Sequence, residues 1–181
     1  MELLDVVDEN NNLIGRQEGR EIVHRDGLWH REIAIWIMNE KGEILLQKRA
    51  STKKQDPNKW DITAGHIDAG EEPLEVAKRE TLEEIGLDLK ENEIEFLFVE
   101  KMEKKFSEVQ YNRMFNYIYL AKTNKDISEY VIQKEELTEV KYVSFEEFED
   151  IIERQDEEYV FSKIPYISKL ISILKNKEEN L

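Results

Sequence analysis

The hydrophobic residues of this chain fall mainly into short β-rich runs that are separated by polar turns. Residues 3–15 predict two extended segments around an Asn-rich turn, and residues 33–49 predict a hairpin with its turn at residues 39–42. A polar loop over residues 50–59 follows this hairpin. Further strands are predicted over residues 60–63, 93–102, 109–121 and 138–144.

Helical spacing of hydrophobic residues appears in three other segments. The clearest is residues 73–85, because Pro73 suits the first turn of a helix and Gly86 suits its C-terminal end. A second helix is predicted over residues 145–154, and a third over about residues 159–177. At roughly 100° per residue, one side of the first helix should face the core. The residues on that side are Leu74, Ala77, Thr81 and Ile85.

These elements predict one α/β domain over residues 1–181, because the chain shows no internal repeat, low-complexity linker or break in composition. The third helix belongs to a C-terminal extension over about residues 156–177, which we expect to cap the domain or to contact another subunit.

The composition excludes several classes of protein. The chain of 181 residues is 40% hydrophobic, which is normal for a soluble globular fold, and 37% charged, which is high. It has no cysteine, so disulfides, thiolate nucleophiles and Cys-zinc sites are excluded. No apolar run approaches the roughly 20 residues of a membrane helix, and the first residues do not resemble a signal peptide. A cytoplasmic location is therefore the expectation.

The formal net charge of −15 narrows the choice of partners. Such a chain should repel nucleic acid and acidic membranes, since no block of Lys and Arg stands out. An acidic protein still binds a small anion when a metal ion links its carboxylates to that anion. We therefore expect a small-molecule ligand, with the oligomeric state, monomer or homodimer, left open.

Three glutamates of the first predicted helix lie on an arc beside its core side. Glu80, Glu83 and Glu84 are related as i, i+3 and i+4, and their mutual repulsion weakens an isolated helix by a few tenths of a kcal/mol per pair. A solvated acidic face explains such a pattern in a chain rich in glutamate. The alternative is a site for a divalent cation, because Mg²⁺ prefers carboxylate, phosphate and water oxygens.

The residues around these glutamates favour the metal site. Residues 65–87 resemble the Nudix box, which runs Gly, five residues, Glu, seven residues, Arg-Glu-aliphatic-any-Glu-Glu-any-Gly-aliphatic. Only Thr81 departs from this pattern, at an aliphatic position on the core side of the helix, and every charged position is intact. The matching residues are Gly65, Glu71, Arg79, Glu80, Glu83, Glu84, Gly86 and Leu87.

The resemblance implies a Nudix-like α/β/α sandwich with a mixed, curved sheet and a loop-helix-loop metal site. It implies that Glu80, Glu83 and Glu84 hold Mg²⁺ or Mn²⁺, with the backbone carbonyl near Gly65 as a further ligand. Glu71 and Arg79 would brace the loop and the helix. The bound metal would polarise a diphosphate and help to ionise the attacking water, and a carboxylate would serve as general base. That base comes from the helix, as Glu83 or Glu84, or from a later loop, where Glu136 is the candidate; a solvent-exposed role for Glu136 is the alternative.

A second resemblance, over roughly residues 1–122, is to the type I isopentenyl-diphosphate isomerases and the Nudix hydrolases most similar to them. All three histidines of the chain, His24, His30 and His66, stand where those isomerases keep metal-binding histidines. As neutral imidazoles they would bind a second divalent ion, and as cations they would hold phosphate oxygens. Each histidine taken singly is more often a surface or packing residue. The basic residues at positions that contact the diphosphate in the isomerases are Arg20, Arg49 and Lys53; Arg49 has the alternative of pairing with a helix glutamate.

The isomerase reaction itself is disfavoured. It requires a cysteine just before the Gly-His pair and a glutamate on a later strand, and here Ala64 takes the cysteine position while Asn112 and Met114 take the strand positions. The leading hypothesis is a metal-dependent hydrolase that cleaves a diphosphate linkage in a nucleoside diphosphate or a related derivative. The alternatives are isomerisation and a non-catalytic diphosphate-binding module. The aromatic residues that are candidates for lining the substrate pocket are Trp36, Trp60, Phe115 and Tyr117.

Overall fold

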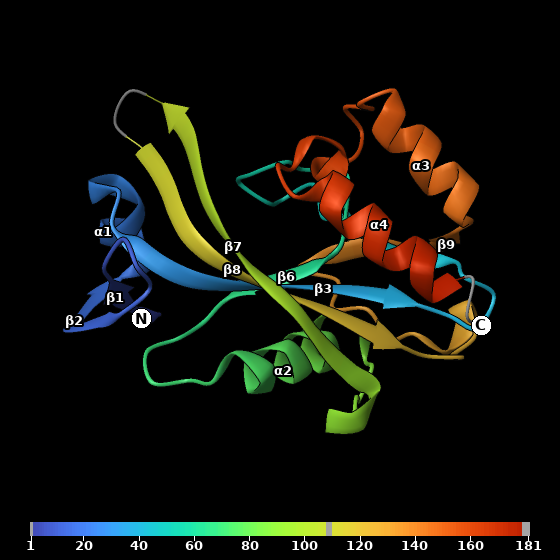
Figure 1. The fold of residues 1–181 in the computed structure, drawn as a ribbon, viewed down its shortest axis with the longest axis horizontal. Helices are drawn as coiled ribbons and strands as arrows, with labels where there is room; N and C mark the ends of the chain where they lie inside the picture. Colours follow the sequence, from blue (N-terminus) through green and yellow to red (C-terminus); the bar gives the residue numbers. More distant parts are fainter. Residues whose placement is uncertain (1, 108–109, 179–181) are drawn as a thin grey trace.

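The computed structural model describes residues 2–107 and 110–178, and it folds into a curved sheet with helices on both of its faces (Figure 1). The strands are β1 (Leu3–Val7), β2 (Leu13–Gly19), β3 (Trp29–Met38), β4 (Ile44–Arg49), β5 (Trp60–Asp61), β6 (Thr63–His66), β7 (Ile94–Ser107), β8 (Gln110–Lys122) and β9 (Leu137–Val143). The helices are α1 (Arg20–Asp26), α2 (Pro73–Ile85), α3 (Phe145–Glu153) and α4 (Ile167–Glu178). Short 3₁₀ turns lie at Glu91–Glu93, Ile127–Glu129 and Val160–Lys163. No helix of the described part of the chain is long and apolar enough to span a membrane.

The main sheet is mixed, as the sequence predicted. Its strand order is β5-β4-β3-β8-β7, with β6 paired to β3 and β9 paired to β4. Strands β3 and β8 run parallel, and the other pairings in this sheet are antiparallel. The predicted hairpin of residues 33–49 does form two strands, but β3 and β4 pair only at Met38 and Ile44. Beyond that point β6 takes the place beside β3, while β4 pairs with β5 and β9.

Each face of the central strand β3 packs against a different helix layer. Ile33, Ile35 and Ile37 belong to the core cluster that includes α2, whereas Trp36 and Met38 belong to the cluster with α3 and α4. Successive side chains of a strand point to opposite faces, so a hydrophobic run without alternation fits a strand that is covered on both sides. Figure 1 shows α2 on one side of the sheet and α3 with α4 on the other.

Helix α2 forms over the residues that the sequence predicted. Pro73 is its first residue, and Gly86 ends it in the left-handed conformation with φ of 65°, while its N–H bonds the carbonyls of the last turn. On the predicted core side Ala77, Thr81 and Ile85 are buried, and Leu74 packs beside them. The hydroxyl of Thr81 donates back to the carbonyl of Ala77 at 3.0 Å, so the polar group is satisfied within the helix.

Other elements differ from the sequence prediction. The last helix does not start at residue 159: a 3₁₀ turn precedes Pro165, and α4 begins at Ile167, because proline lacks the N–H that a continuous helix needs. The short elements α1 and β6 were not predicted. Strand β7 extends to Ser107, beyond the predicted end. The predicted start of the next strand, residue 109, lies outside the described residues.

Trp36, a candidate for the substrate pocket, lies in the core instead. Its side chain is fully buried, and its ring centroid lies 5.5 Å from those of Phe148 and Phe161. It therefore joins the sheet to α3 and to the 3₁₀ turn that precedes α4, and no ligand can reach it without unfolding of this layer.

We expect Trp36→Ala to lower the free energy of unfolding by about 3–5 kcal/mol, because it removes a large buried ring and leaves a cavity. Urea denaturation measures this loss. Trp29→Ala is the matched control, since the ring of Trp29 is only partly buried, and it should cost less. An equal or larger loss for the Trp29 variant would contradict the assignment of Trp36 to the core.

Candidate active site

The three glutamates of helix α2 differ in how far their side chains are exposed to solvent. The side chain of Glu80 is 16% exposed and that of Glu83 is 54% exposed. Glu84 is partly buried against the sheet. A purely solvated acidic face would leave all three exposed, so this arrangement withdraws two carboxylates from water for a reason other than solubility.

Arg79 links the glutamates to the loop before the helix. Its Nη1 donates to Glu80 at 2.8 Å and to Glu83 at 3.3 Å, and its Nη2 donates to Glu71 at 3.0 Å. Burial alone would lower the pKa of Arg79, but the bond to Glu71 and the neighbouring carboxylates raise it above its usual value. The loop that precedes α2 is thereby tied to the face of the helix that carries the glutamates.

Gly65 lets β6 approach this helix closely. A Cβ atom at residue 65 would lie 2.7 Å from both Cδ and Oε1 of Glu80, closer than real Cβ contacts allow. Any larger residue would displace the Glu80 carboxylate. The backbone of Gly65 and the carboxylate of Glu80 therefore share one small space.

Glu84 lies in the most unfavourable electrostatic environment of the three glutamates. Burial is the main cause that raises its pKa to about 8, and a hydrogen bond from Gln47 opposes the rise. Other carboxylates add to the rise through their negative charge. These are Glu80, Glu136 and Asp61.

Asp61, opposite Gln47 in the pairing of β5 with β4, is a further carboxylate of this cluster. Burial raises the pKa of Asp61 to about 6, although the charge of Arg49 opposes the rise. Carboxylates that keep raised pKa values beside such cations carry more negative charge than the cations offset, and a hard divalent cation with oxygen ligands offsets the rest. The donor set therefore fits Mg²⁺ or Mn²⁺.

Two of the predicted basic residues and Glu136 lie at the rim of this cluster. Arg49 donates to Asp61 at 3.3 Å, and Lys53 forms an ion pair with Glu136. The N–H of Gln133 donates to the carbonyl of Glu84 at 2.9 Å, which attaches the segment before Glu136 to α2. The carbonyl of Glu136 in turn accepts from the N–H of the residue after Arg49, at 2.8 Å.

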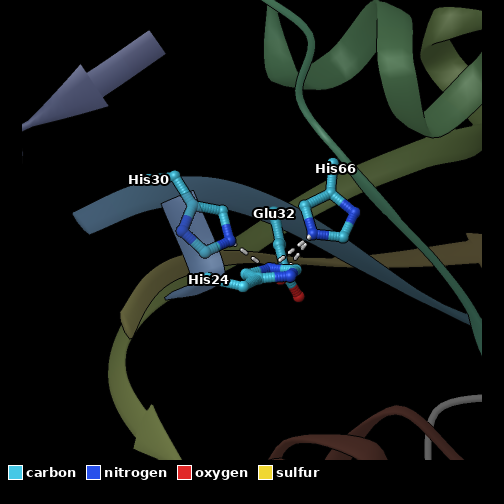
Figure 2. A group of neighbouring side chains, drawn as sticks. All are labelled: His24, His30, Glu32 and His66. Atoms are coloured by element: carbon cyan, nitrogen blue, oxygen red, sulfur yellow. Dashed lines mark hydrogen bonds and ion pairs between the residues drawn. The ribbon is translucent and has the colours of Figure 1, made fainter. Parts of the chain in front are cut away.

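The three histidines form a second cluster with a residue that the sequence analysis did not select. Figure 2 shows His24 from α1, His30 and Glu32 from β3, and His66 from β6 turned toward one another. One ligand atom of each residue lies within 4.8 Å of those of the other three. The Nε2 atom of His30 lies 3.1 Å from Oε1 of Glu32, and Nε2 of His66 lies 3.2 Å from the same oxygen. Arg20, the remaining predicted basic residue, starts α1 beside this cluster and pairs with Glu2 at 3.3 Å.

The chemistry of this second cluster favours metal over phosphate. His30 is fully buried and His24 is 8% exposed, so neither is a surface residue. Burial lowers the pKa of His24, and it lowers that of His66 to about 3. Neutral imidazoles are the form that binds metal ions, whereas holding phosphate by charge requires the cation.

Strand β6 separates the two clusters. Gly65 pairs with Ile33, and His66 pairs with Glu32, so these neighbouring residues face opposite sides of the sheet. The Glu80 carboxylate lies on the α2 side of this strand, and the histidines lie on the other.

Comparison with known proteins decides the family. The model of the NUDIX domain matches residues 28–163, which include all of α2 and most of the sheet. This chain belongs to the Nudix family.

Several curated Nudix relatives cover most of the chain. Nudix hydrolase 3 of Arabidopsis thaliana is 36% identical over 186 residues, which cover 97% of this chain but 24% of the plant protein, so the chain spans about a quarter of that relative. An uncharacterized Nudix hydrolase of Clostridium acetobutylicum is 34% identical, with 81% of this chain and 71% of the relative covered. An isopentenyl-diphosphate isomerase of Photorhabdus laumondii is 29% identical, with 90% of each protein covered.

Solved structures share the fold. A Deinococcus radiodurans protein matches with a TM-score of 0.65 at 16% identity, covering 97% of this chain and 98% of that one. The NUDIX domain of NrtR from Shewanella oneidensis, crystallised with ADP ribose, matches with a TM-score of 0.56 at 15% identity, covering 81% of this chain and 86% of that one. At these identities the likeness shows the mixed α/β fold alone.

The sequence analysis did not select three residues that lie at the two clusters, namely Glu32, Asp61 and Gln47. Glu32 was within reach, because it follows His30 by two residues on a strand and therefore shares its face. Asp61 and Gln47 gave no local signal. Their position beneath α2 depends on the pairing of β4 with β5 and on the packing of a helix that lies far along the chain.

The raised pKa of Glu84 predicts how stability of the metal-free Nudix domain depends on pH. The folded pKa of about 8 lies above the ordinary value of 4.5, so the unfolded chain loses this proton first. Stability should fall as pH rises between these two values and level off above pH 8. Glu84→Gln removes this loss and should unfold at a higher temperature than the parent protein at pH 8, by roughly 2–4 °C for each 1 kcal/mol.

Thermal unfolding in EDTA from pH 5 to pH 8.5 measures this difference. The midpoints of the two proteins should be most similar at the acidic end, because pH 5 lies close to the ordinary value of 4.5 and most of the loss accumulates at higher pH. A constant difference across the whole range would show that Glu84 does not titrate as its surroundings require.

Proposed function

We propose that this Nudix protein is a hydrolase that cleaves a diphosphate linkage in a nucleoside diphosphate or a related derivative, with Mg²⁺ or Mn²⁺ as cofactor. The observation that carries the proposal is the partly buried carboxylate cluster, in which Glu84 of α2 lies near enough to Glu80 and Asp61 for their charges to act on it. Family membership supports hydrolysis of a phosphate-containing compound. The donor set supports dependence on a divalent ion.

In this proposal Glu80, Glu83 and Glu84 hold the metal, with the carbonyl of Gly65 as a further ligand. A bound divalent ion would polarise the diphosphate and lower the pKa of a coordinated water. Glu71 and Arg79 keep the loop and the helix in place through the hydrogen bonds described above.

Glu136 is the proposed general base from the later loop, and Glu83 or Glu84 is the alternative from the helix. The charge of Glu136 acts on Glu84, so its carboxylate lies near the ligands. Its ion pair with Lys53 supports a role for Lys53 in controlling when the Glu136 carboxylate is available. A diphosphate that attracts the Lys53 ammonium would release the Glu136 carboxylate to accept a proton from water.

The substrate class follows from the rim of the cluster and from the relatives. Arg49 and Lys53 supply positive charge next to the carboxylates, as an anionic diphosphate requires. The structural neighbour NrtR holds ADP ribose, which contains a diphosphate between two ribose groups. We therefore place nucleoside diphosphate derivatives first among candidate substrates.

Glu83→Gln and Glu84→Gln should each lower turnover by roughly 10²-fold or more, because each removes a charged metal ligand while keeping the side-chain shape. Formation of phosphate-containing cleavage products from a panel of nucleoside diphosphate derivatives, with Mg²⁺ and with EDTA, measures the effect. Glu75→Gln is the matched control, since Glu75 lies on the same helix, is exposed and pairs with Lys78. Full activity in both site variants, or unchanged activity in EDTA, would refute the assignment.

The second cluster supports a second proposed ion. Three imidazoles and one carboxylate suit a transition metal such as Zn²⁺, Co²⁺ or Mn²⁺ better than Mg²⁺. In this proposal Arg20, beside the histidine cluster, contacts a phosphate oxygen of a substrate that reaches the histidine side of β6. Glu32 supplies the carboxylate. The amide of Asn112, which is uncharged, donates to Glu32 at 3.0 Å.

Added Co²⁺ should give a visible absorption band from this cluster, and His24→Ala or Glu32→Gln should lower Co²⁺ affinity by roughly 10-fold or more. Glu21→Gln on the exposed side of α1 is the control. If Co²⁺ binds equally to all four proteins, the histidine cluster is a packing feature rather than a metal site.

The isomerase alternative has weaker support, although an isomerase is among the relatives. The cysteine position holds Ala64, which is exposed on β6 and has no group that could transfer a proton. Deuterium from solvent should not enter isopentenyl diphosphate, and mass spectrometry after incubation at high enzyme concentration tests this. Incorporation of deuterium would favour isomerisation over hydrolysis.

A further inference from the structure

Gln47 is a buried amide that contacts one of the glutamates of α2. It lies on β4 with 3% of its surface exposed. Its Nε2 atom donates to Oε2 of Glu84 at 2.7 Å and to the carbonyl of Ile62 at 3.2 Å. Its Oε1 atom accepts from the hydroxyl of Thr63 at 3.0 Å. Every polar atom of this amide is therefore used.

These partners fix the direction in which the amide points. The carbonyl of Ile62 can only accept a hydrogen bond, so the nitrogen of Gln47 must lie on that side. The hydroxyl of Thr63 holds the oxygen on the other side. A flipped amide would set two oxygens against each other at Ile62, and again at Glu84 when its carboxylate is ionised.

The fixed amide determines what the Glu84 carboxylate can do. One of its oxygens accepts from Gln47, and the other is left for a different partner. In a partly buried place, a donor that is already oriented favours the ionised carboxylate and limits its rotation. Outer hydrogen bonds of this kind commonly set the orientation of metal ligands.

We propose that Gln47, held by Thr63, is a positioning residue that orients Glu84 for the divalent ion. This inference rests on the proposed function, because it assumes that Glu84 is a metal ligand. The competing view is that Gln47 only satisfies buried polar groups beneath α2. In that view, changes at Gln47 alter stability but not the affinity for the ion.

Mn²⁺ titration followed by electron paramagnetic resonance separates these views, since it measures free ion without any substrate. The titration is made in the His24→Ala background, so that the histidine cluster contributes less. Gln47→Leu should weaken Mn²⁺ binding by roughly 10–100-fold, and it should lower kcat more than it raises KM. Gln17→Leu is the matched control, because Gln17 makes the same amide-to-carboxylate bond, to Asp5 at 3.0 Å, on the exposed strand β2.

Two gentler variants keep the test valid if Gln47→Leu does not fold. Thr63→Val removes the hydroxyl that orients Gln47 but keeps the side-chain shape, whereas Thr63→Ser keeps the hydroxyl. The Ser variant should bind Mn²⁺ at least about threefold more tightly than the Val variant, as expected for loss of one outer hydrogen bond. Equal affinities in these two variants would overturn the proposal, as would parent-like affinity in a folded Gln47→Leu protein.

Glu84→Gln distinguishes failure of this inference from failure of the proposed function. If Glu84→Gln binds Mn²⁺ like the parent protein, Glu84 is not a ligand and both ideas fail. If Glu84→Gln binds weakly while Gln47→Leu and Thr63→Val bind normally, the metal site stands and only the role of Gln47 is lost.

Discussion

The repulsion among carboxylates that are partly withdrawn from water is the constraint on which the site depends. Several negative groups meet beneath and beside α2, and burial makes each charge harder to hold. The neighbouring cations neutralise only part of this charge. The ion pairs are Arg79 with Glu80, Arg49 with Asp61, and Lys53 with Glu136. Glu84 makes no ion pair among the described residues and has an amide instead. The carboxylates therefore carry more charge than the neighbouring cations neutralise, and a divalent ion is the ligand that best neutralises the remainder.

Strand β6 places these carboxylates next to the histidine cluster, which has a different chemistry. Glycine at residue 65 permits close approach of the helix, and the next side chain, His66, points to the opposite face, where it contacts Glu32. The α2 side offers hard oxygen ligands, whereas the other side offers mostly nitrogen ligands. These preferences differ enough that two kinds of ion can be bound without competing for one site.

Features that depend on neighbouring residues could be predicted from the sequence, and features that depend on distant pairing could not. Helix α2 was predicted to the residue because Pro73, Gly86 and the spacing of its buried face are local signals. The mixed sheet followed from the family resemblance. The predicted start of α4 was wrong because the hydrophobic pattern continues through Pro165, whereas a helical backbone cannot. Trp36 was misjudged because alternation along a strand does not tell which face holds ligand. Gln47 becomes meaningful only once the packing of α2 against β4 is known.

Glu32 bears on the choice between hydrolysis and isomerisation. The related isomerases take carboxylates from a later strand, where this chain has Asn112 and Met114. Strand β3 pairs in parallel with that strand, and the carboxylate of Glu32 reaches the place beside Asn112 and accepts a hydrogen bond from its amide. The cluster therefore has a carboxylate, and it comes from β3. The cysteine has no such replacement, since Ala64 is the residue at its position. A set of metal ligands without the proton-transfer groups is what we expect if the histidine cluster binds an ion, while the carboxylates under α2 serve the chemistry.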